Sequence, residues 1–190
     1  MNNYIIYLYN KMFSQLQLII GPMFSGKSTE LLKRCKKYNI CKYNCILIKY
    51  LNDTRYSNNQ IITHDKQYVQ IKTLSLDNIT NYLQELNNYD VIGIDEGQFF
   101  KDIDSILELL KYNKIIIIAA LDATFEVKPF QNILNLIPHC ENVIKLNSIC
   151  MKCYSCDGTF TKRIVNDNCV ELIGGVDKYQ TLCRKCFYSN

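Results

Sequence analysis

The residues Gly21-Pro22-Met23-Phe24-Ser25-Gly26-Lys27-Ser28 fit the pattern Gly-x4-Gly-Lys-Ser/Thr. An apolar run, Leu16 to Ile20, precedes them, and a segment with helical spacing, Ser28 to Tyr38, follows. A loop between such a strand and helix points backbone N–H groups at phosphate oxygens, and the helix N-terminus adds partial positive charge. The stretch therefore predicts a phosphate-binding loop, with Lys27 reaching the β- and γ-phosphates and Ser28 ligating magnesium.

Apolar runs like the first one recur along the chain. They are Cys45 to Tyr50, Asp90 to Ile94, Ile115 to Ala120 and Val143 to Leu146. Continuous apolarity, rather than alternation, is typical of strands that are covered on both faces. Segments with helical spacing lie between several of them, including Leu76 to Leu86 and Ile103 to Leu110. This order predicts an α/β fold with a parallel sheet flanked by helices.

The composition sets limits on the kind of protein. The chain has 190 residues, of which 48% are hydrophobic, 21% are charged and ten are cysteines, and its formal net charge is +4. This mild excess gives no dense basic stripe, so binding to nucleic acid is not predicted. The apolar stretch Tyr4 to Tyr9 is too short to span a bilayer, and no basic residue precedes it as in an export signal. We expect a cytoplasmic protein with reduced thiols and no membrane partner.

Two carboxylates follow the apolar run Val91 to Ile94. Asp95 and Glu96 thus stand at the carboxyl end of a predicted strand, where open α/β sheets bind ligands. The first carboxylate suits magnesium held through water. Glu96 is then available to act as a base, or to position water, in a phosphoryl transfer.

The cysteines near the C-terminus predict a zinc site. Cys150-x2-Cys153 and Cys183-x2-Cys186 form two pairs whose thiolates would give zinc a closed tetrahedral shell, which is typical of a structural site. Cys156 makes Cys153-x2-Cys156 a competing pair on spacing alone.

The motifs together resemble a known family over nearly the whole chain. They are Gly21 to Leu31, Asp53-Thr54-Arg55-Tyr56, Ile94-Asp95-Glu96-Gly97-Gln98-Phe99-Phe100, Lys128-Pro129-Phe130, Thr161-Lys162-Arg163, Ile173-Gly174-Gly175-Val176-Asp177-Lys178-Tyr179 and Cys183-Arg184-Lys185-Cys186. In this order they are similar to the zinc-containing type II thymidine kinases of animals, bacteria and large DNA viruses. In that family the first zinc pair is in register with Cys150 and Cys153, which favours these residues over Cys156.

The resemblance implies transfer of the γ-phosphoryl group of ATP to the 5′-hydroxyl of thymidine or deoxyuridine. It implies that Glu96 is the catalytic base, that Arg55 and Lys27 face the phosphates, and that Asp95 joins the loop residues in binding ATP and magnesium. It places a nucleoside pocket at Met23, Phe99, Phe125 and Phe130. A lasso between the cysteine pairs would cover the base, at Thr161, Leu172, Ile173, Gly174, Gly175, Val176 and Tyr179.

A change in composition divides the chain. From Asn147 onward, Cys, Gly and charged residues replace the long periodic runs, so we expect residues 1–15 to be an N-terminal extension, 16–146 an ATP-binding α/β domain, and 147–190 a zinc-binding and lasso subdomain. The resemblance implies a homotetramer, inhibition by thymidine triphosphate, and residence in the host cytoplasm if the source is a virus. The polar segment Thr54 to His64 is expected to be a mobile loop.

Two other readings start from the same motifs. One is a phosphate-loop ATPase whose zinc module binds nucleic acid, which the modest charge disfavours. The other is a regulatory nucleotide-binding protein without turnover. Because Lys27, Ser28, Asp95 and Glu96 are all present, the sequence favours an active kinase.

Overall fold

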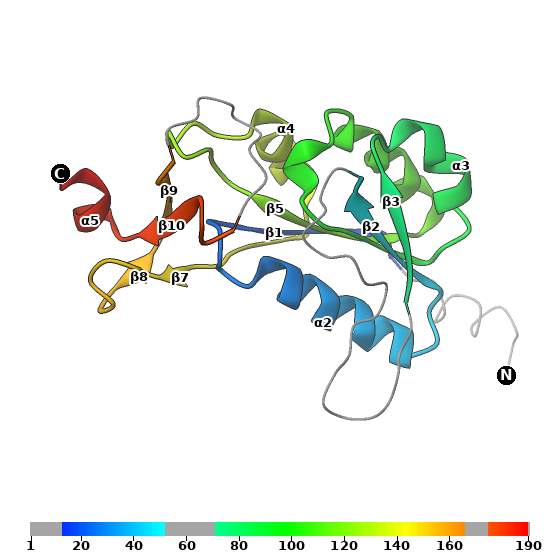
Figure 1. Cartoon of the computed structure of the whole chain (residues 1–190). Helices are drawn as coiled ribbons and strands as arrows, with labels where there is room; N and C mark the ends of the chain where they lie inside the picture. Colours follow the sequence, from blue (N-terminus) through cyan, green and yellow to red (C-terminus); the bar gives the residue numbers. More distant parts are fainter. Residues whose placement is uncertain (1–12, 52–70, 166–174, 190) are drawn as a thin grey trace, which may run out of the picture.

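A computed structural model describes residues 13–51, 71–165 and 175–189. Its centre is a six-stranded sheet in the order β3-β2-β4-β5-β1-β6, and every pairing in it is parallel (Figure 1). The strands are β1 (Gln15–Gly21), β2 (Cys45–Tyr50), β3 (Lys72–Leu76), β4 (Val91–Ile94), β5 (Ile115–Leu121) and β6 (Asn142–Lys145). The predicted parallel sheet is confirmed.

Helices cover both faces of the sheet. The long helix α2 (Lys27–Ile40) runs along one face, and the other elements lie on the opposite side (Figure 1). These are the short helices α3 (Leu83–Leu86) and α4 (Gln131–Leu134) and the 3-10 helices η1 (Thr80–Tyr82), η2 (Gly97–Phe99), η3 (Ile103–Tyr112) and η4 (Ile137–His139). Among the described residues, no helix is long and apolar enough to cross a membrane.

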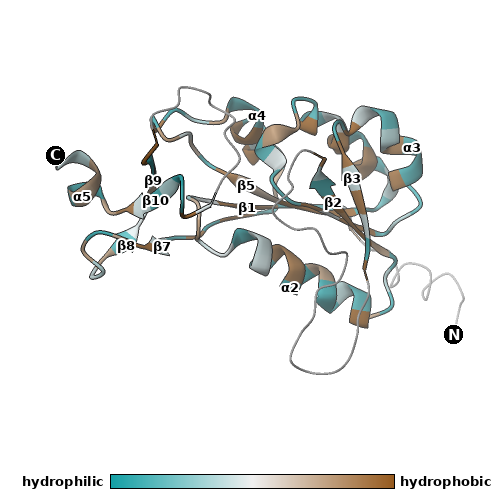
Figure 2. Cartoon of the chain, in the orientation of Figure 1, coloured by the Kyte–Doolittle hydropathy of each residue, from teal (hydrophilic) through white to brown (hydrophobic). Residues whose placement is uncertain are grey.

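Successive side chains of the central strands point to opposite faces of the sheet and pack in two separate hydrophobic cores. On β5, Ile117 packs in the core that contains Leu31 and Cys35 of α2. Its neighbour Ile118 faces the other core, which contains Phe100. Because both faces are buried, β4 and β5 carry no polar side chain. Figure 2 shows the centre of the sheet largely in brown.

One glycine of the sheet explains how closely α2 approaches. A Cβ atom at Gly93 on β4 would lie 2.7 Å from Cys35 Sγ and 2.7 Å from a methyl group of Leu47. A larger residue would therefore push α2 away from the sheet, and with it the loop that precedes the helix.

The structure differs from the sequence prediction in two elements. Leu76, expected to begin a helix, ends strand β3, which the apolar pattern does not predict. β3 lies at the edge of the sheet and has the polar sequence KTLSL, so it carries little of the apolar signal of a central strand. The expected helix from Ile103 to Leu110 is present as the 3-10 helix η3.

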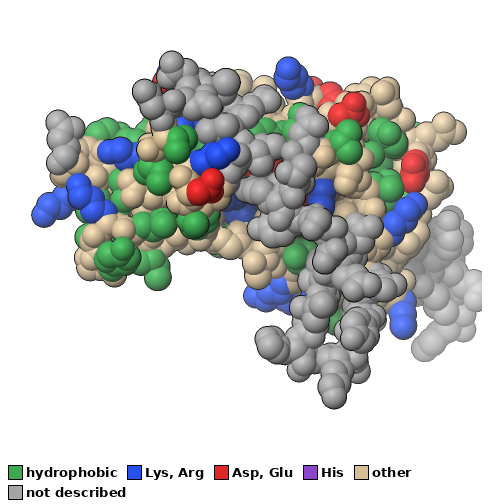
Figure 3. All heavy atoms as spheres, in the orientation of Figure 1, with side chains coloured by type: hydrophobic (Ala, Val, Ile, Leu, Met, Phe, Trp, Pro, Cys, Tyr) green, Lys and Arg blue, Asp and Glu red, His purple; other side chains and the backbone are tan. Residues whose placement is uncertain are grey.

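The C-terminal part forms small elements beyond the sheet. β7 (Ser148–Ile149) pairs with β8 (Asp157–Gly158), β9 (Phe160–Arg163) pairs with β10 (Tyr179–Leu182), and helix α5 (Arg184–Tyr188) follows. All lie at the end of the sheet where α2 begins (Figure 1), and hydrophobic side chains gather on their surface (Figure 3). The division of the chain at residues 15 and 146 stays a prediction.

Candidate active site

The phosphate loop joins β1 to α2 as the sequence predicts. Gly21 has φ 144°, and a Cβ atom there would lie 2.2 Å from the carbonyl oxygen of Leu146. Gly26 has φ 80° and immediately precedes the helix. Lys27 Nζ donates a hydrogen bond of 2.6 Å to the carbonyl oxygen of Pro22, so its ammonium group lies over the loop. Because their φ angles are positive, Gly21 and Gly26 occupy backbone conformations that other residues adopt only with strain.

The two residues that are predicted to hold magnesium, Ser28 and Asp95, come from different elements. Ser28 Oγ, on the first turn of α2, donates a hydrogen bond of 2.9 Å to Asp95 Oδ1 at the end of β4. Burial raises the pKa of the Asp95 carboxyl to about 6, and the charge of Glu96 adds to the rise. The Ser28 hydrogen bond and the charge of Lys27 act in the opposite direction. A hydroxyl and a carboxylate so placed are ligands that Mg²⁺ prefers.

Glu96 is held in an unusual backbone conformation. Its φ is 53° and its ψ is 42°, in the left-handed region that residues other than glycine seldom occupy. Its Oε2 accepts a hydrogen bond of 2.6 Å from Gln98 Nε2. The chain leaves β4 through this turn, and the neighbouring carboxylates have different partners: Gln98 for Glu96 and Ser28 for Asp95.

The hairpin β9–β10 is attached to the phosphate loop at Met23. The backbone N–H of Met23 donates to Thr161 Oγ1 at 3.0 Å, and Thr181 Oγ1 donates to the carbonyl oxygen of Met23 at 3.4 Å. Both threonines are buried. The predicted pocket residues Met23 and Thr161, 138 positions apart in sequence, are therefore in direct contact.

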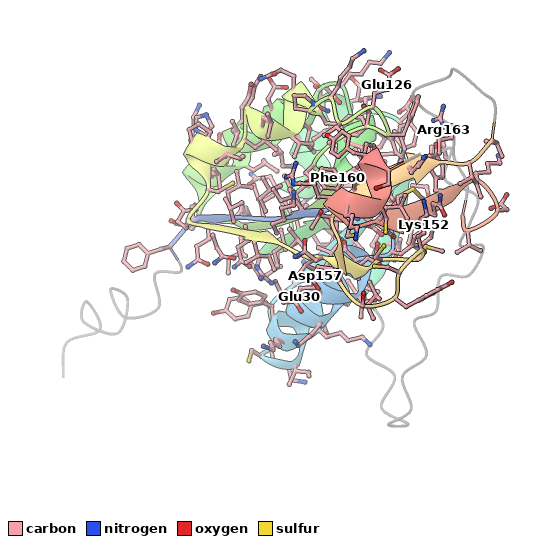
Figure 4. The ribbon with its side chains drawn as sticks, turned by 90° about the vertical axis from the view of Figure 1, so that its left-hand side faces the viewer. Glu30, Glu126, Lys152, Asp157, Phe160 and Arg163 are labelled. Atoms are coloured by element: carbon pink, nitrogen blue, oxygen red, sulfur yellow. The ribbon has the colours of Figure 1, made fainter. Side chains whose placement is uncertain are left out.

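A buried arginine joins the hairpin to the predicted wall of the pocket. The guanidinium carbon of Arg163 on β9 lies 3.9 Å from the ring centroid of Phe125, within cation–π range. Arg163 also donates a hydrogen bond of 2.7 Å to the hydroxyl of Tyr179 on β10. Figure 4 looks onto this end of the molecule, with Phe160 and Arg163 labelled on β9. The structure thus links Phe125 and Tyr179, which sequence reasoning named separately.

Only some of the other predicted pocket residues lie in the part of the chain that the structure describes. The ring of Phe99 lies 5.3 Å from that of Tyr50 at the end of β2. Phe130 precedes α4, and its N–H donates to the carbonyl oxygen of Asp122 at 3.3 Å. Gly175 and Val176 stand just before β10, with Val176 exposed. Arg55, the segment Thr54 to His64, Leu172, Ile173 and Gly174 lie outside the described residues.

Gln98, Arg163 and Thr181 have contacts in the site but no role predicted from the sequence. The first two stand inside motifs that carry the family resemblance, and their presence there was the available signal. Thr181 had no signal, because its only distinction is the contact with a loop far away in sequence.

Four cysteines come together at the end of the β9–β10 hairpin where Cys183 follows β10. The sulfur atoms of Cys150, Cys153, Cys183 and Cys186 all lie within 4.8 Å of one another. This group of the described residues does not include Cys156, which is exposed. Hydrogen bonds from Ser155 lower the pKa of the Cys153 thiol to about 6. The two spaced pairs come together as the sequence predicts.

The fold and the loop define a class of protein. A phosphate loop between a strand and a helix of a parallel sheet, with a carboxylate at the end of another strand of the sheet, is the arrangement of phosphate-loop nucleotide-binding proteins. Among solved structures, the flagellar accessory protein FlaH from Methanocaldococcus jannaschii superposes with a TM-score of 0.48 at 14% identity, covering 80% of this chain and 73% of that chain.

Comparison of sequences defines the family within this class. The family described as "Thymidine kinase" matches residues 14–187. The thymidine kinase of Sheeppox virus (strain KS-1) is 51% identical over 177 residues, 93% of this chain and 98% of that protein. Those of Variola virus (isolate Human/India/Ind3/1967) and Vaccinia virus (strain Western Reserve) are each 50% identical over 173 residues, 90% of this chain and 96% of theirs. The chain belongs to the thymidine kinase family.

Proposed function

We propose that this protein transfers the γ-phosphoryl group of ATP to the 5′-hydroxyl of thymidine, forming thymidine monophosphate and ADP. The observation that supports this reaction best is the meeting of two groups at the end of β4. Ser28 of the phosphate loop contacts Asp95, and the next residue, Glu96, is the carboxylate that we propose as the base. Membership in the thymidine kinase family supports thymidine as the acceptor of the phosphoryl group.

Each group has a part in the transfer. The loop N–H groups and Lys27 bind the β- and γ-phosphates and balance the charge that develops between them. As the bond from O5′ to the γ-phosphorus forms, the bond from that phosphorus to the β,γ-bridging oxygen breaks, and its electron pair leaves with ADP. The proton of the 5′-hydroxyl passes to the Glu96 carboxylate. Arg55 is proposed to face the phosphates as well.

Magnesium would be held by Ser28 and, through water, by Asp95. When bound, it neutralises charge on the phosphate oxygens. The raised pKa of Asp95 fits this assignment, because a carboxyl that burial leaves poorly solvated gains most from a cation beside it.

The four-cysteine cluster fits zinc. Bonds of about 2.3 Å in a tetrahedron place neighbouring sulfur atoms roughly 3.8 Å apart, and the Cys153 and Cys183 sulfur atoms are 3.9 Å apart. Four thiolates would leave no open position, so zinc would serve structure rather than catalysis. Cys183 immediately follows β10, so the site would fix one end of the hairpin that contacts Met23.

The nucleoside is proposed to bind between the phosphate loop and the hairpin. Met23, Phe99, Phe125 and Phe130 would offer apolar and aromatic surface, and Thr161 with Tyr179 would line the side formed by β9 and β10. The lasso residues Leu172, Ile173, Gly174, Gly175 and Val176 would cover the base. Deoxyuridine is a second proposed acceptor. A homotetramer, inhibition by thymidine triphosphate, a site of action in the host cytoplasm and the absence of a nucleic-acid partner complete the proposal.

The test is phosphorylation of thymidine, deoxyuridine and deoxycytidine by purified protein with ATP and magnesium. We expect thymidine to be phosphorylated fastest. Glu96→Gln should lower kcat by about 100-fold or more with little change in the KM for thymidine, because general-base catalysis typically contributes 10²–10⁴-fold. An unchanged kcat in that variant would remove Glu96 from the role of base. ATP hydrolysis that nucleic acid stimulates, without nucleoside phosphorylation, would establish the alternative ATPase.

A further inference from the structure

The side-chain amide of Gln98 connects Glu96 to the end of strand β5. Gln98 is 5% exposed. Its Nε2 donates a hydrogen bond of 2.6 Å to Glu96 Oε2, and its Oε1 accepts a hydrogen bond of 2.9 Å from the backbone N–H of Leu121. Because a backbone N–H only donates, the atom facing Leu121 must be the amide oxygen, so the NH₂ group must face Glu96. The network thus fixes which end of the amide meets the carboxylate.

The turn that carries Gln98 is itself anchored. Asn132 on α4 donates through Nδ2 to the carbonyl oxygens of Gln98, at 3.1 Å, and of Phe100, at 3.0 Å. A Cβ atom at Gly97 would lie 2.7 Å from a methyl group of Ile118 on β5. The turn therefore lies directly on the sheet, and little room is left for Gln98 to move.

We propose that Gln98 is a positioning residue for the phosphoryl transfer, which acts by holding the Glu96 carboxylate in the orientation that receives the proton of the 5′-hydroxyl. This rests on the proposed role of Glu96 as base. A glutamate side chain has three rotatable bonds, and a base must lie within hydrogen-bond reach of its proton. The bond to Gln98 removes most of that freedom before substrate binds, so less ordering is needed during the reaction.

A purely structural role gives a different expectation. Gln98 also provides the acceptor for the Leu121 N–H, which would otherwise lose its partner. If that were its whole purpose, replacing Gln98 would change stability, and its effect on kcat would not depend on whether residue 96 can act as a base. The two roles are therefore separated by a double-variant comparison.

The decisive experiment measures kcat and the KM for thymidine in Gln98→Met and Gln98→Glu, in the full chain with zinc bound. Methionine keeps similar volume without the amide, whereas glutamate keeps an oxygen for Leu121 but removes the NH₂ group that faces Glu96. Both should lower kcat by about 10- to 100-fold, since misplacement of a catalytic group costs up to roughly 10²-fold, with KM within about threefold. Gln131→Ala, an exposed glutamine next to Asn132 on α4, is the control and should keep wild-type kcat.

The second arm places Gln98→Met in the Glu96→Gln background. The proposal expects no further fall in the residual kcat, because there is no longer a base to orient. An equal fall in both backgrounds, or wild-type kcat in folded Gln98→Met, overturns it. A normal kcat in Glu96→Gln alone would instead refute the proposed base.

If Gln98→Met does not fold, Asn132→Ala decides. It leaves both bonds of the Gln98 amide intact and removes the two bonds that support the turn, together with the bond that Asn132 Oδ1 accepts from the Ile133 N–H. The proposal therefore expects a fall of about threefold to tenfold in kcat, again absent in the Glu96→Gln background. Unchanged kcat in Asn132→Ala would then refute the proposal.

Discussion

Asp95→Asn should stabilise the ligand-free protein while weakening its response to magnesium. The reason is the rise of the Asp95 pKa from 3.8 to about 6, which burial causes and the Glu96 charge increases. The folded state therefore holds the proton more tightly than the unfolded chain does. Stability from this group is fully present below pH 3.8, falls as pH rises, and is lost once pH passes about 6.

The size of the effect follows from the two pKa values. At 1.36 kcal/mol for each pH unit between them, the charged Asp95 costs about 3 kcal/mol of folding free energy above pH 6. Asparagine keeps the shape and an oxygen acceptor for the Ser28 hydroxyl but carries no charge. It should regain about 1–3 kcal/mol at pH 7.5, the lower value applying if the amide NH₂ group finds no partner.

The measurement is urea unfolding of the ligand-free protein between pH 4 and 8, repeated with magnesium and ATP. Wild type should lose stability between pH 4 and 6, and Asp95→Asn should lose less over that interval. Magnesium with ATP should stabilise wild type more than the variant, because the carboxylate is the proposed ligand. Asp104→Asn, on the exposed side of η3, should behave as wild type. Equal stability of Asp95→Asn and wild type at pH 7.5, with the same pH dependence, would refute this reasoning.

Two further predictions concern the C-terminal elements. Cys183→Ser should release zinc, measured as less than one equivalent by metal analysis, and lower the melting temperature, whereas Cys156→Ser should keep the metal; loss of zinc from Cys156→Ser with retention in Cys183→Ser would reverse the ligand choice. Arg163→Met should raise the KM for thymidine about tenfold, with a far smaller effect on the KM for ATP, because loss of a desolvated cation–π contact of about 1–2 kcal/mol frees the Phe125 ring. Equal changes in both KM values would argue against that contact.

Contiguous patterns in the sequence predicted most of the fold. The central strands β2, β4 and β5 are apolar on both faces, so their signal does not depend on knowing which face is covered. The edge strand β3 has neighbours on one side only and tolerates Lys72 and Ser75, which hides it. Periodicity also cannot separate an α-helix from a 3-10 helix over ten residues, as at η3.

The candidate site, like the fold, has parts that the sequence predicts and parts that it does not. The phosphate loop and the cysteine pairs are local in sequence, and their geometry follows from spacing and residue type. The contact between Met23 and Thr161 joins residues 138 positions apart, and the contact of Arg163 with Phe125 depends on where strand β9 lies relative to the loop after β5. Residue type alone gives Arg163 a surface position by default, since arginine is seldom buried. Tertiary structure is needed to see that its charge lies against an aromatic ring.

Gln98 shows most clearly why sequence distance is a poor guide to catalytic support. Residues 96 and 98 would lie on the same face of an extended strand, about 7 Å apart at their Cα atoms, and would point in nearly opposite directions on an α-helix. Neither case predicts a hydrogen bond of 2.6 Å between their side chains. The bond forms because Glu96 adopts φ 53° and a 3-10 turn begins at Gly97. A left-handed glutamate costs roughly 1–2 kcal/mol, and such strain persists only where surrounding contacts enforce it. Here Asn132 and the Leu121 N–H supply those contacts, which is the pattern expected if the turn exists to aim the Glu96 carboxylate rather than to end a strand.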